Sequence, residues 1–154
     1  MNQGSNQVVK AAITAVGGYV PDTILSNQDL EKMVDTNDEW ITSRTGIKER
    51  RILKDPEKAT SYLAIQAAND LISKKNLDPS TLDLVLVATI TPDMHVAATA
   101  AYVASSIGAT NAFAYDLNAA CSGFLYGMSS AAAYISSGRY KKILLIGADK
   151  MSSI

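Results

Sequence analysis

Cys121, the only cysteine of the chain, lies where its thiol could act as a nucleophile. The apolar run 112–115 precedes it and is typical of a short buried strand, and a charge-free stretch of small and apolar residues follows it. Apolar side chains then recur at helical spacing, at Phe124, Met128, Ala132 and Ile135. The sequence therefore predicts that Cys121 lies in the first turn of a helix and that Gly138 is the C-terminal cap of this helix.

A helix start suits nucleophilic chemistry, because its unpaired backbone N–H groups and the helix dipole favour a thiolate, the reactive form of cysteine. Small residues on one side of this helix would let another element approach closely: Gly123, Gly127, Ser130 and Ala131. A helix without charges is expected to be buried, which would hold Cys121 rigidly and away from water. The alternative is that Cys121 is only a small buried apolar residue.

Trp40 and Arg44 form a second group with chemical potential, since residues four apart share one face of a helix. An indole beside a guanidinium can stack on a purine and hold a phosphate. The alternative is a helix that packs its tryptophan into the core and leaves the arginine outside. The residues alone leave both interpretations open.

His95 is the only histidine, and a cysteine enzyme often uses a histidine as its base. Nothing in the sequence directs His95 toward Cys121, because it falls at the start of a loop before a helix. We therefore expect a surface or interface position for it.

These residues must be positioned by alternating strands and helices, which indicate an α/β fold with a mainly parallel sheet. Predicted strands cover residues 9–16, 47–52, 84–90, 112–115 and 142–148. Predicted helices cover 27–34 with Asn27 as its N-cap, 37–46 with Asn37 as its N-cap and Gly46 at its end, 60–76 with Asn76 at its end, 97–107, and the Cys121 segment. Ligands gather at the carboxyl ends of parallel strands, which is where Thr91–Asp93 and Asn118–Cys121 fall.

Composition narrows the class of protein. The 154 residues suit one domain, and 14 basic against 15 acidic residues argue against nucleic acid as a partner. A single cysteine excludes an internal disulfide and suits a reducing cytoplasm. The polar start lacks a signal-peptide pattern, and no apolar run approaches the ~20 residues needed to span a membrane.

Two long motifs carry a resemblance to a known family. Residues 116–124 resemble the active-site segment of β-ketoacyl-acyl-carrier-protein synthase III, and residues 27–41 with 44–51 resemble another segment of it. The loop Thr91–Asp93 and residues 146–149 match as well, so the likeness runs from about Val8 to the end. The resemblance implies a thiolase-like fold of two similar halves, with residues 1–154 as the N-terminal half and the nucleophile helix buried at their junction.

The resemblance also implies a reaction. Cys121 would take an acyl group, usually acetyl, from acyl-coenzyme A, and malonyl-acyl carrier protein would then lose carbon dioxide and attack the thioester. The backbone N–H of Cys121 would be an oxyanion donor. Trp40 matches the residue that stacks on the adenine of coenzyme A, Arg44 one that contacts the coenzyme, and Thr36 one near the adenine.

Further expectations follow from the family pattern. It implies a homodimer, no permanently bound cofactor and no metal, and its catalytic histidine and asparagine lie in a second half that residues 1–154 do not contain. Ala97 stands where family members often have proline, and Val96 falls where the family places a side chain of the neighbouring subunit at the acyl pocket. The acyl chain length therefore stays open. Two other interpretations compete: a related condensing enzyme of polyketide or hydrocarbon synthesis, and a non-catalytic half-domain.

Overall fold

The structure is a computed structural model that describes residues 10–153, and its elements divide into two compact units. The larger unit contains residues 59–150 and the described chain up to Tyr19, and the smaller unit contains residues 20–58 and the end of the chain. Helices and strands of the larger unit are α3 (Thr60–Lys75), β3 (Leu84–Ala88), α4 (Thr99–Ser106), β4 (Phe113–Leu117), α5 (Gly123–Ser136) and β5 (Ile143–Gly147). Those of the smaller unit are β1 (Ile24–Ser26), α1 (Asn27–Glu31), α2 (Asp38–Thr45) and β2 (Glu49–Arg51). Three short 3-10 helices span Pro79–Thr81, Ala120–Ser122 and Met151–Ser153.

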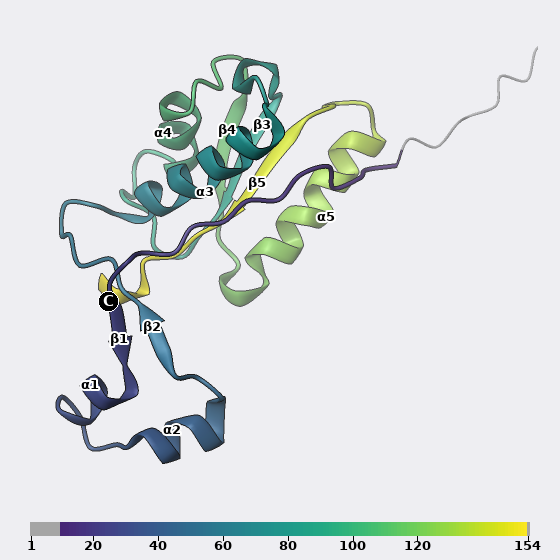
Figure 1. The fold of residues 1–154 in the computed structure, drawn as a ribbon. Coiled ribbons are helices and arrows are strands. Elements are labelled where there is room, and N and C mark those ends of the chain that lie inside the picture. Colours follow the sequence, from purple (N-terminus) through teal and green to yellow (C-terminus); the bar gives the residue numbers. More distant parts are fainter. Residues whose placement is uncertain (1–9, 154) are drawn as a thin grey trace, which may run out of the picture. The chain divides into compact units, whose positions relative to one another are not determined.

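A parallel sheet in the order β4-β3-β5 forms the centre of the larger unit (Figure 1). All five residues of β3 are buried, as a continuous apolar strand with both faces covered requires. In register, Val87 lies between Asp116 of β4 and Ile146 of β5. The predicted α/β class is confirmed, and the parallel arrangement brings the carboxyl ends of three strands to one edge.

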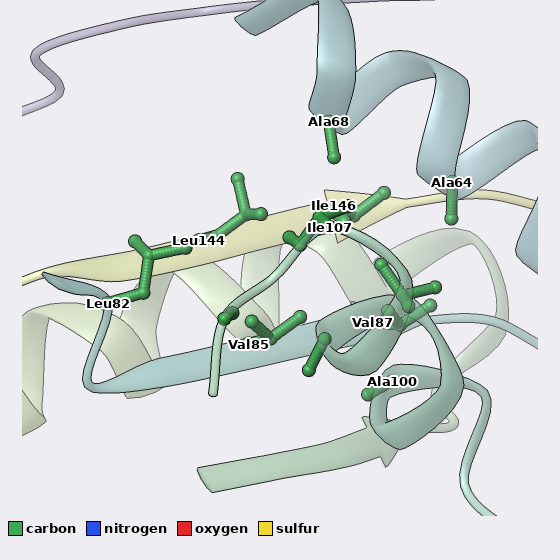
Figure 2. Close-up of a cluster of buried hydrophobic side chains, with 12 residues drawn as sticks. Ala64, Ala68, Leu82, Val85, Val87, Ala100, Ile107, Leu144 and Ile146 are labelled. Carbon is green, nitrogen blue, oxygen red and sulfur yellow. The ribbon is translucent and has the colours of Figure 1, made fainter. Parts of the chain in front are cut away.

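One face of this sheet packs against α3 and α4 through a cluster of apolar side chains (Figure 2). Val85 and Val87 of β3 lie beside Leu144 and Ile146 of β5 in this cluster. Burying one such side chain contributes roughly 1.5–3 kcal/mol. α3 can lie close to the sheet because the side chains that it contributes to the buried cluster, Ala64 and Ala68, are small.

The other face of the sheet packs against α5 through glycines, as the sequence predicted. A Cβ atom added at Gly127 would lie 2.5 Å from Leu145 Cδ1, and one at Gly123 would lie 3.3 Å from the Cβ of Ala88. The far side of α5 is open in the described chain, where Leu125 is 62% and Tyr126 is 58% exposed. The cover expected on all sides of this helix is therefore not supplied by residues 10–153.

The smaller unit is built on an antiparallel pair in which Ile24 lies opposite Arg51. α1 is shorter than the predicted helix 27–34, and its N-cap is Ser26, so the expectation that Asn27 caps it is wrong. Ser26 and Asp29 form a reciprocal capping box. The hydroxyl of Ser26, followed by the Lys32 ammonium, lowers the pKa of Asp29 to about 2.

The predicted strands differ from the observed ones mainly at their ends, with one exception. The predicted strands 84–90, 112–115 and 142–148 form as β3, β4 and β5 within a few residues, and the predicted strand 47–52 is shortened to β2. The predicted strand 9–16 is wrong for its described residues, which form no strand. Val9 itself lies outside the described residues. A strand needs a neighbour for its N–H and C=O groups, and Ile13 and Val16 are instead 77% and 74% exposed.

Candidate active site

Cys121 lies at the carboxyl edge of the parallel sheet, four residues after β4 ends. It occupies the middle of the 3-10 turn Ala120–Ser122, immediately before α5. The prediction that Cys121 lies in the first turn of the helix is therefore corrected, because α5 begins two residues after it, at Gly123. The turn begins at Ala120, whose φ of 46° is in the left-handed region that alanine seldom adopts.

This strained turn presents the cysteine outward. Cys121 is exposed in the described chain, so residues 10–153 neither bury it as a small apolar residue nor hold it away from water. The N-cap of α5, Ser122, makes no side-chain bond to the first N–H groups of the helix. A backbone held in an unfavourable conformation next to a reactive side chain is a common feature of functional sites.

Aspartates beside strand ends, to which the sequence analysis assigned no role, fix the loops of this edge. The N-cap residues of α3 and α4 are Ala59 and Ala98, whose side chains cannot accept a hydrogen bond. Asp93 instead accepts the Ser61 N–H at 2.8 Å. Asp116 accepts the N–H groups of Thr99 and Ala100, each at 2.7 Å. The signal in the sequence was an alanine just before each helix, together with an aspartate within the last residues of a strand or in the loop after it.

Asp149 performs the same role after β5. One of its carboxylate oxygens accepts the hydroxyl of Thr89 at 2.9 Å and the N–H of Ile90 at 2.8 Å. The same oxygen accepts the hydroxyl of Thr91 at 3.2 Å, and the Thr60 and Thr91 hydroxyls are 2.8 Å apart. The loop after β3 is thus tied to the loop after β5, and the residues 91–93 and 146–149 noted in the sequence act within this scaffold.

His95 is exposed in the loop between β3 and α4, as expected. In residues 10–153, no hydrogen bond connects it with Cys121. Its neighbour Val96 is fully exposed and Met94 is 58% exposed. The described chain therefore supplies the candidate nucleophile without a histidine base.

Trp40 and Arg44 share one face of α2 in the smaller unit, as their spacing predicted. The Arg44 guanidinium carbon lies 5.8 Å from the centroid of the Trp40 ring, and Trp40 is 55% exposed. The alternative that Trp40 packs into the core is therefore wrong. Asn37 caps α2 by accepting the Trp40 N–H at 2.7 Å, and Gly46 ends the helix with a φ of 73°. Thr36 is half-buried just before this cap.

Two other kinds of site are absent from the part of the chain that the structure describes. No three His, Cys, Asp or Glu side chains between residues 10 and 153 come together in a way that could hold a metal ion. No helix in the same range is long and apolar enough to cross a membrane.

Comparisons with known proteins bear on this site. Residues 115–154 match the family model of 3-oxoacyl-acyl-carrier-protein (ACP) synthase III. The β-ketoacyl-acyl-carrier-protein synthase III of Chlorobium chlorochromatii is 61% identical over 146 residues, which are 95% of this chain and 44% of that protein. The crystal structure of 3-oxoacyl-acyl-carrier-protein synthase III from Aquifex aeolicus matches with a TM-score of 0.88 and 48% identity, over 94% of this chain and 46% of that one. The Thermus thermophilus enzyme gives a TM-score of 0.86 and 43% identity, over 94% and 44%.

The chain belongs to the β-ketoacyl-acyl-carrier-protein synthase III family. It spans less than half the length of the curated relatives it matches and has the thiolase-like fold of the family's N-terminal half. The segment from the middle of β4 onward, with Ala120, Cys121 and Asp149, lies inside the match to the family model. An alignment over 146 of 154 residues leaves only the extreme ends outside, so α2 is also part of the family likeness.

Proposed function

We propose that this chain is the acyl-accepting half of a condensing enzyme that joins an acyl group, acetyl in the first instance, to malonyl-acyl carrier protein and so initiates fatty-acid synthesis. One observation carries the proposal: Cys121 is exposed on a strained turn at the carboxyl edge of the sheet, within the segment that the family model matches. The chemistry of that position is nucleophilic.

The reaction that fits these residues has two parts. The Cys121 thiolate attacks the thioester carbonyl of acyl-coenzyme A, a tetrahedral oxyanion forms, and coenzyme A leaves as its thiolate. The backbone N–H of Cys121 is our candidate donor to that oxyanion. Malonyl-acyl carrier protein then loses carbon dioxide, and the resulting carbanion attacks the acyl-cysteine. The Cys121 thiolate is released, and the product is a 3-oxoacyl carrier protein.

The outer face of α2 is the proposed contact for coenzyme A. Trp40 is exposed with the Arg44 guanidinium over its ring, an arrangement that suits stacking on adenine beside a phosphate. Thr36, just before the cap of α2, would lie near the adenine. No metal and no permanently bound cofactor take part in the proposed reaction.

We further propose that residues 1–154 act only with a segment equivalent to the second half of the relatives; together they are called the assembled enzyme below. The exposed face of α5 and the absence of a histidine bonded to Cys121 in residues 10–153 support this. A homodimer, with the exposed loop at Val96 near its interface, and a location in the cytoplasm complete the proposal.

Product formation tests this function. The assembled enzyme, given acetyl-coenzyme A and malonyl-acyl carrier protein, should form acetoacetyl carrier protein, and Cys121→Ala should form none above background. Residues 1–154 alone should form none either. Condensation at the wild-type rate by Cys121→Ala would refute the role of the thiol, and no condensation by the assembled wild type would favour a non-catalytic half-domain.

Trp40→Ala tests the coenzyme site separately. Aromatic stacking on a nucleobase is worth about 1–3 kcal/mol, so the KM for acetyl-coenzyme A should rise ~5- to 150-fold. The rate with acyl groups delivered on carrier protein should change much less. An unchanged KM would remove Trp40 from the proposed site.

A further inference from the structure

Asn27 occupies the centre of a polar cluster in the smaller unit, although it is not on the helix proposed to contact coenzyme A. It is fully buried and is the only buried polar residue in the described range 20–58. A buried amide without partners would cost free energy, so the bonds that it makes constrain the elements around it.

The Asn27 amide connects three parts of the smaller unit. Its Nδ2 donates to Asp38 Oδ1 at 2.6 Å and lies 3.3 Å from Thr42 Oγ1, both on α2. Nδ2 also donates to the backbone oxygen of Ile47 at 2.9 Å, and Oδ1 accepts from the Arg50 guanidinium of β2. The amide therefore bridges a cation on the strand and a carboxylate on the helix.

These contacts lie on the side of α2 that faces away from Trp40. Asp38 and Thr42 are four residues apart on one face, with the buried Ile41 next to them. Trp40 and Arg44 each follow two residues later, which is about 200° around a helix at 3.6 residues per turn. The inner face is held by Asn27, and the outer face presents the indole and the guanidinium.

α2 has little else to hold it in the smaller unit. Ile41 is its one buried apolar side chain. The other side-chain bonds that link the helix to the backbone or side chains around it lie at its two ends: Glu31 accepts the Asp38 N–H at 2.6 Å and Asn37 provides the cap, and Thr45 of the last turn accepts the Ile47 N–H at 3.0 Å. In residues 20–58, the Asn27 amide is the group from another element that lies within hydrogen-bonding distance of the Thr42 side chain.

We infer that Asn27 is a positioning residue for coenzyme A binding: through Asp38 and Thr42 it sets the orientation of α2, and thereby of Trp40 and Arg44, relative to β2. It does not touch the coenzyme. This inference rests on the proposed function of Trp40 and Arg44 and adds to it a residue that controls affinity from beneath the helix.

The sharpest test is Asn27→Asp in the assembled enzyme. The new carboxylate matches the amide in size and keeps its partner Arg50. It would face the Asp38 carboxylate and lose the bonds that Nδ2 donates to Asp38 and to the Ile47 oxygen, together with the longer contact to Thr42. The KM for acetyl-coenzyme A should rise about 3- to 10-fold, the size of one or two lost hydrogen bonds. The kcat at saturating acetyl-coenzyme A should change by less than about twofold.

Ser26→Ala is the matched control, because it removes the capping bond of α1 without touching α2. Ser26→Ala should lower the melting temperature about as much as Asn27→Asp does, and it should leave the KM for acetyl-coenzyme A at the wild-type value. A KM in Asn27→Asp equal to wild type, or a KM that rises equally in Ser26→Ala, would overturn the inference, since the residue would then be merely structural.

Thr42→Val keeps the inference falsifiable if Asn27→Asp does not fold. It preserves the side-chain volume and removes the Thr42 hydroxyl, which lies 3.3 Å from the amide nitrogen and donates to Asp38 Oδ1 at 3.2 Å, so the KM should rise about twofold. An unchanged KM in a folded Thr42→Val, when Asn27→Asp does not fold, would overturn the inference.

Trp40→Ala separates this inference from the function on which it rests. If Trp40→Ala raises the KM and Asn27→Asp does not, only the positioning role fails. If Trp40→Ala leaves the KM unchanged, the coenzyme site itself is misassigned, and the role of Asn27 falls with it.

Discussion

Different forces stabilise the interior of each of the two units of the chain. The larger unit buries a continuous apolar strand, β3, between helices on both faces of a parallel sheet. The smaller unit has one buried apolar side chain in residues 20–58, Ile41, and depends on the polar partners of Asn27. The proposed nucleophile is supported by packing, whereas the proposed coenzyme contact is supported by hydrogen bonds.

The contrast has a physical consequence. Apolar packing is non-directional and tolerates small shifts, but it resists the loss of volume strongly. Hydrogen bonds contribute less each, yet they specify direction. A turn that must stay strained, such as the one at Ala120, is best supported by a rigid core. A helix that must aim two side chains outward is best set by directional bonds on its other face.

Removing volume from β3 should have the largest effect and should be confined to the larger unit. Leu86 is fully buried, so Leu86→Ala should cost about 2–5 kcal/mol in the free energy of unfolding of that unit. Native-state hydrogen exchange should show lost protection in β3 and unchanged protection in α2. Equal loss in α2 would mean that the two units are not held independently.

Asp116 offers an intermediate perturbation, because it is a directional contact inside the packed unit. Asp116→Ala removes the acceptors of the Thr99 and Ala100 N–H groups and should cost about 0.5–2 kcal/mol, as lost helix caps do. Faster exchange of these two amides is the measurement. Asp116→Asn, which retains one acceptor oxygen, should lose about half as much, and unaltered exchange in both variants would contradict the capping role.

The smallest expected effect is the response of α1 to acid. The Ser26 hydroxyl and the Lys32 ammonium lower the pKa of Asp29 to about 2 in the folded chain. A carboxyl whose folded pKa lies below its unfolded value of about 3.9 stabilises the fold above that unfolded value. This contribution should be lost as the pH falls from about 4 to about 2.

A nuclear magnetic resonance titration of the Asp29 carboxyl checks this, with Ser26→Ala as its control. The variant should return the pKa of Asp29 toward 3.8, the value from which it is lowered. A wild-type Asp29 that already titrates near that value would show that the capping box does not form.

The sequence predicted the elements that local pattern determines. The apolar run of β3 and the caps at Asn37, Asn76 and Gly46 were read correctly, because each depends on residues nearby. β1 was missed because a three-residue strand has no periodicity. Pattern also predicted the shared face of Trp40 and Arg44, and the structure shows it.

The expectations that failed depend on distant partners. Asn27 was read as a helix cap from its type, but its amide is engaged by α2 and β2 and Ser26 caps instead. The segment 9–16 has strand composition and no neighbouring strand in its described part. The turn at Ala120 could not be foreseen, since nothing about an alanine in sequence indicates a positive φ.

The most direct test of the role proposed for Cys121 is to determine which residue of the assembled enzyme becomes acylated. The assembled enzyme should be incubated with acetyl-coenzyme A without malonyl-acyl carrier protein, digested, and analysed by peptide mass spectrometry. We expect one acetyl group on the peptide that contains Cys121 and none in Cys121→Ala, with Trp40→Ala reaching the same extent only at higher acetyl-coenzyme A. Acetylation at another residue of the wild type, or no acetylation at saturating acetyl-coenzyme A, would contradict the account.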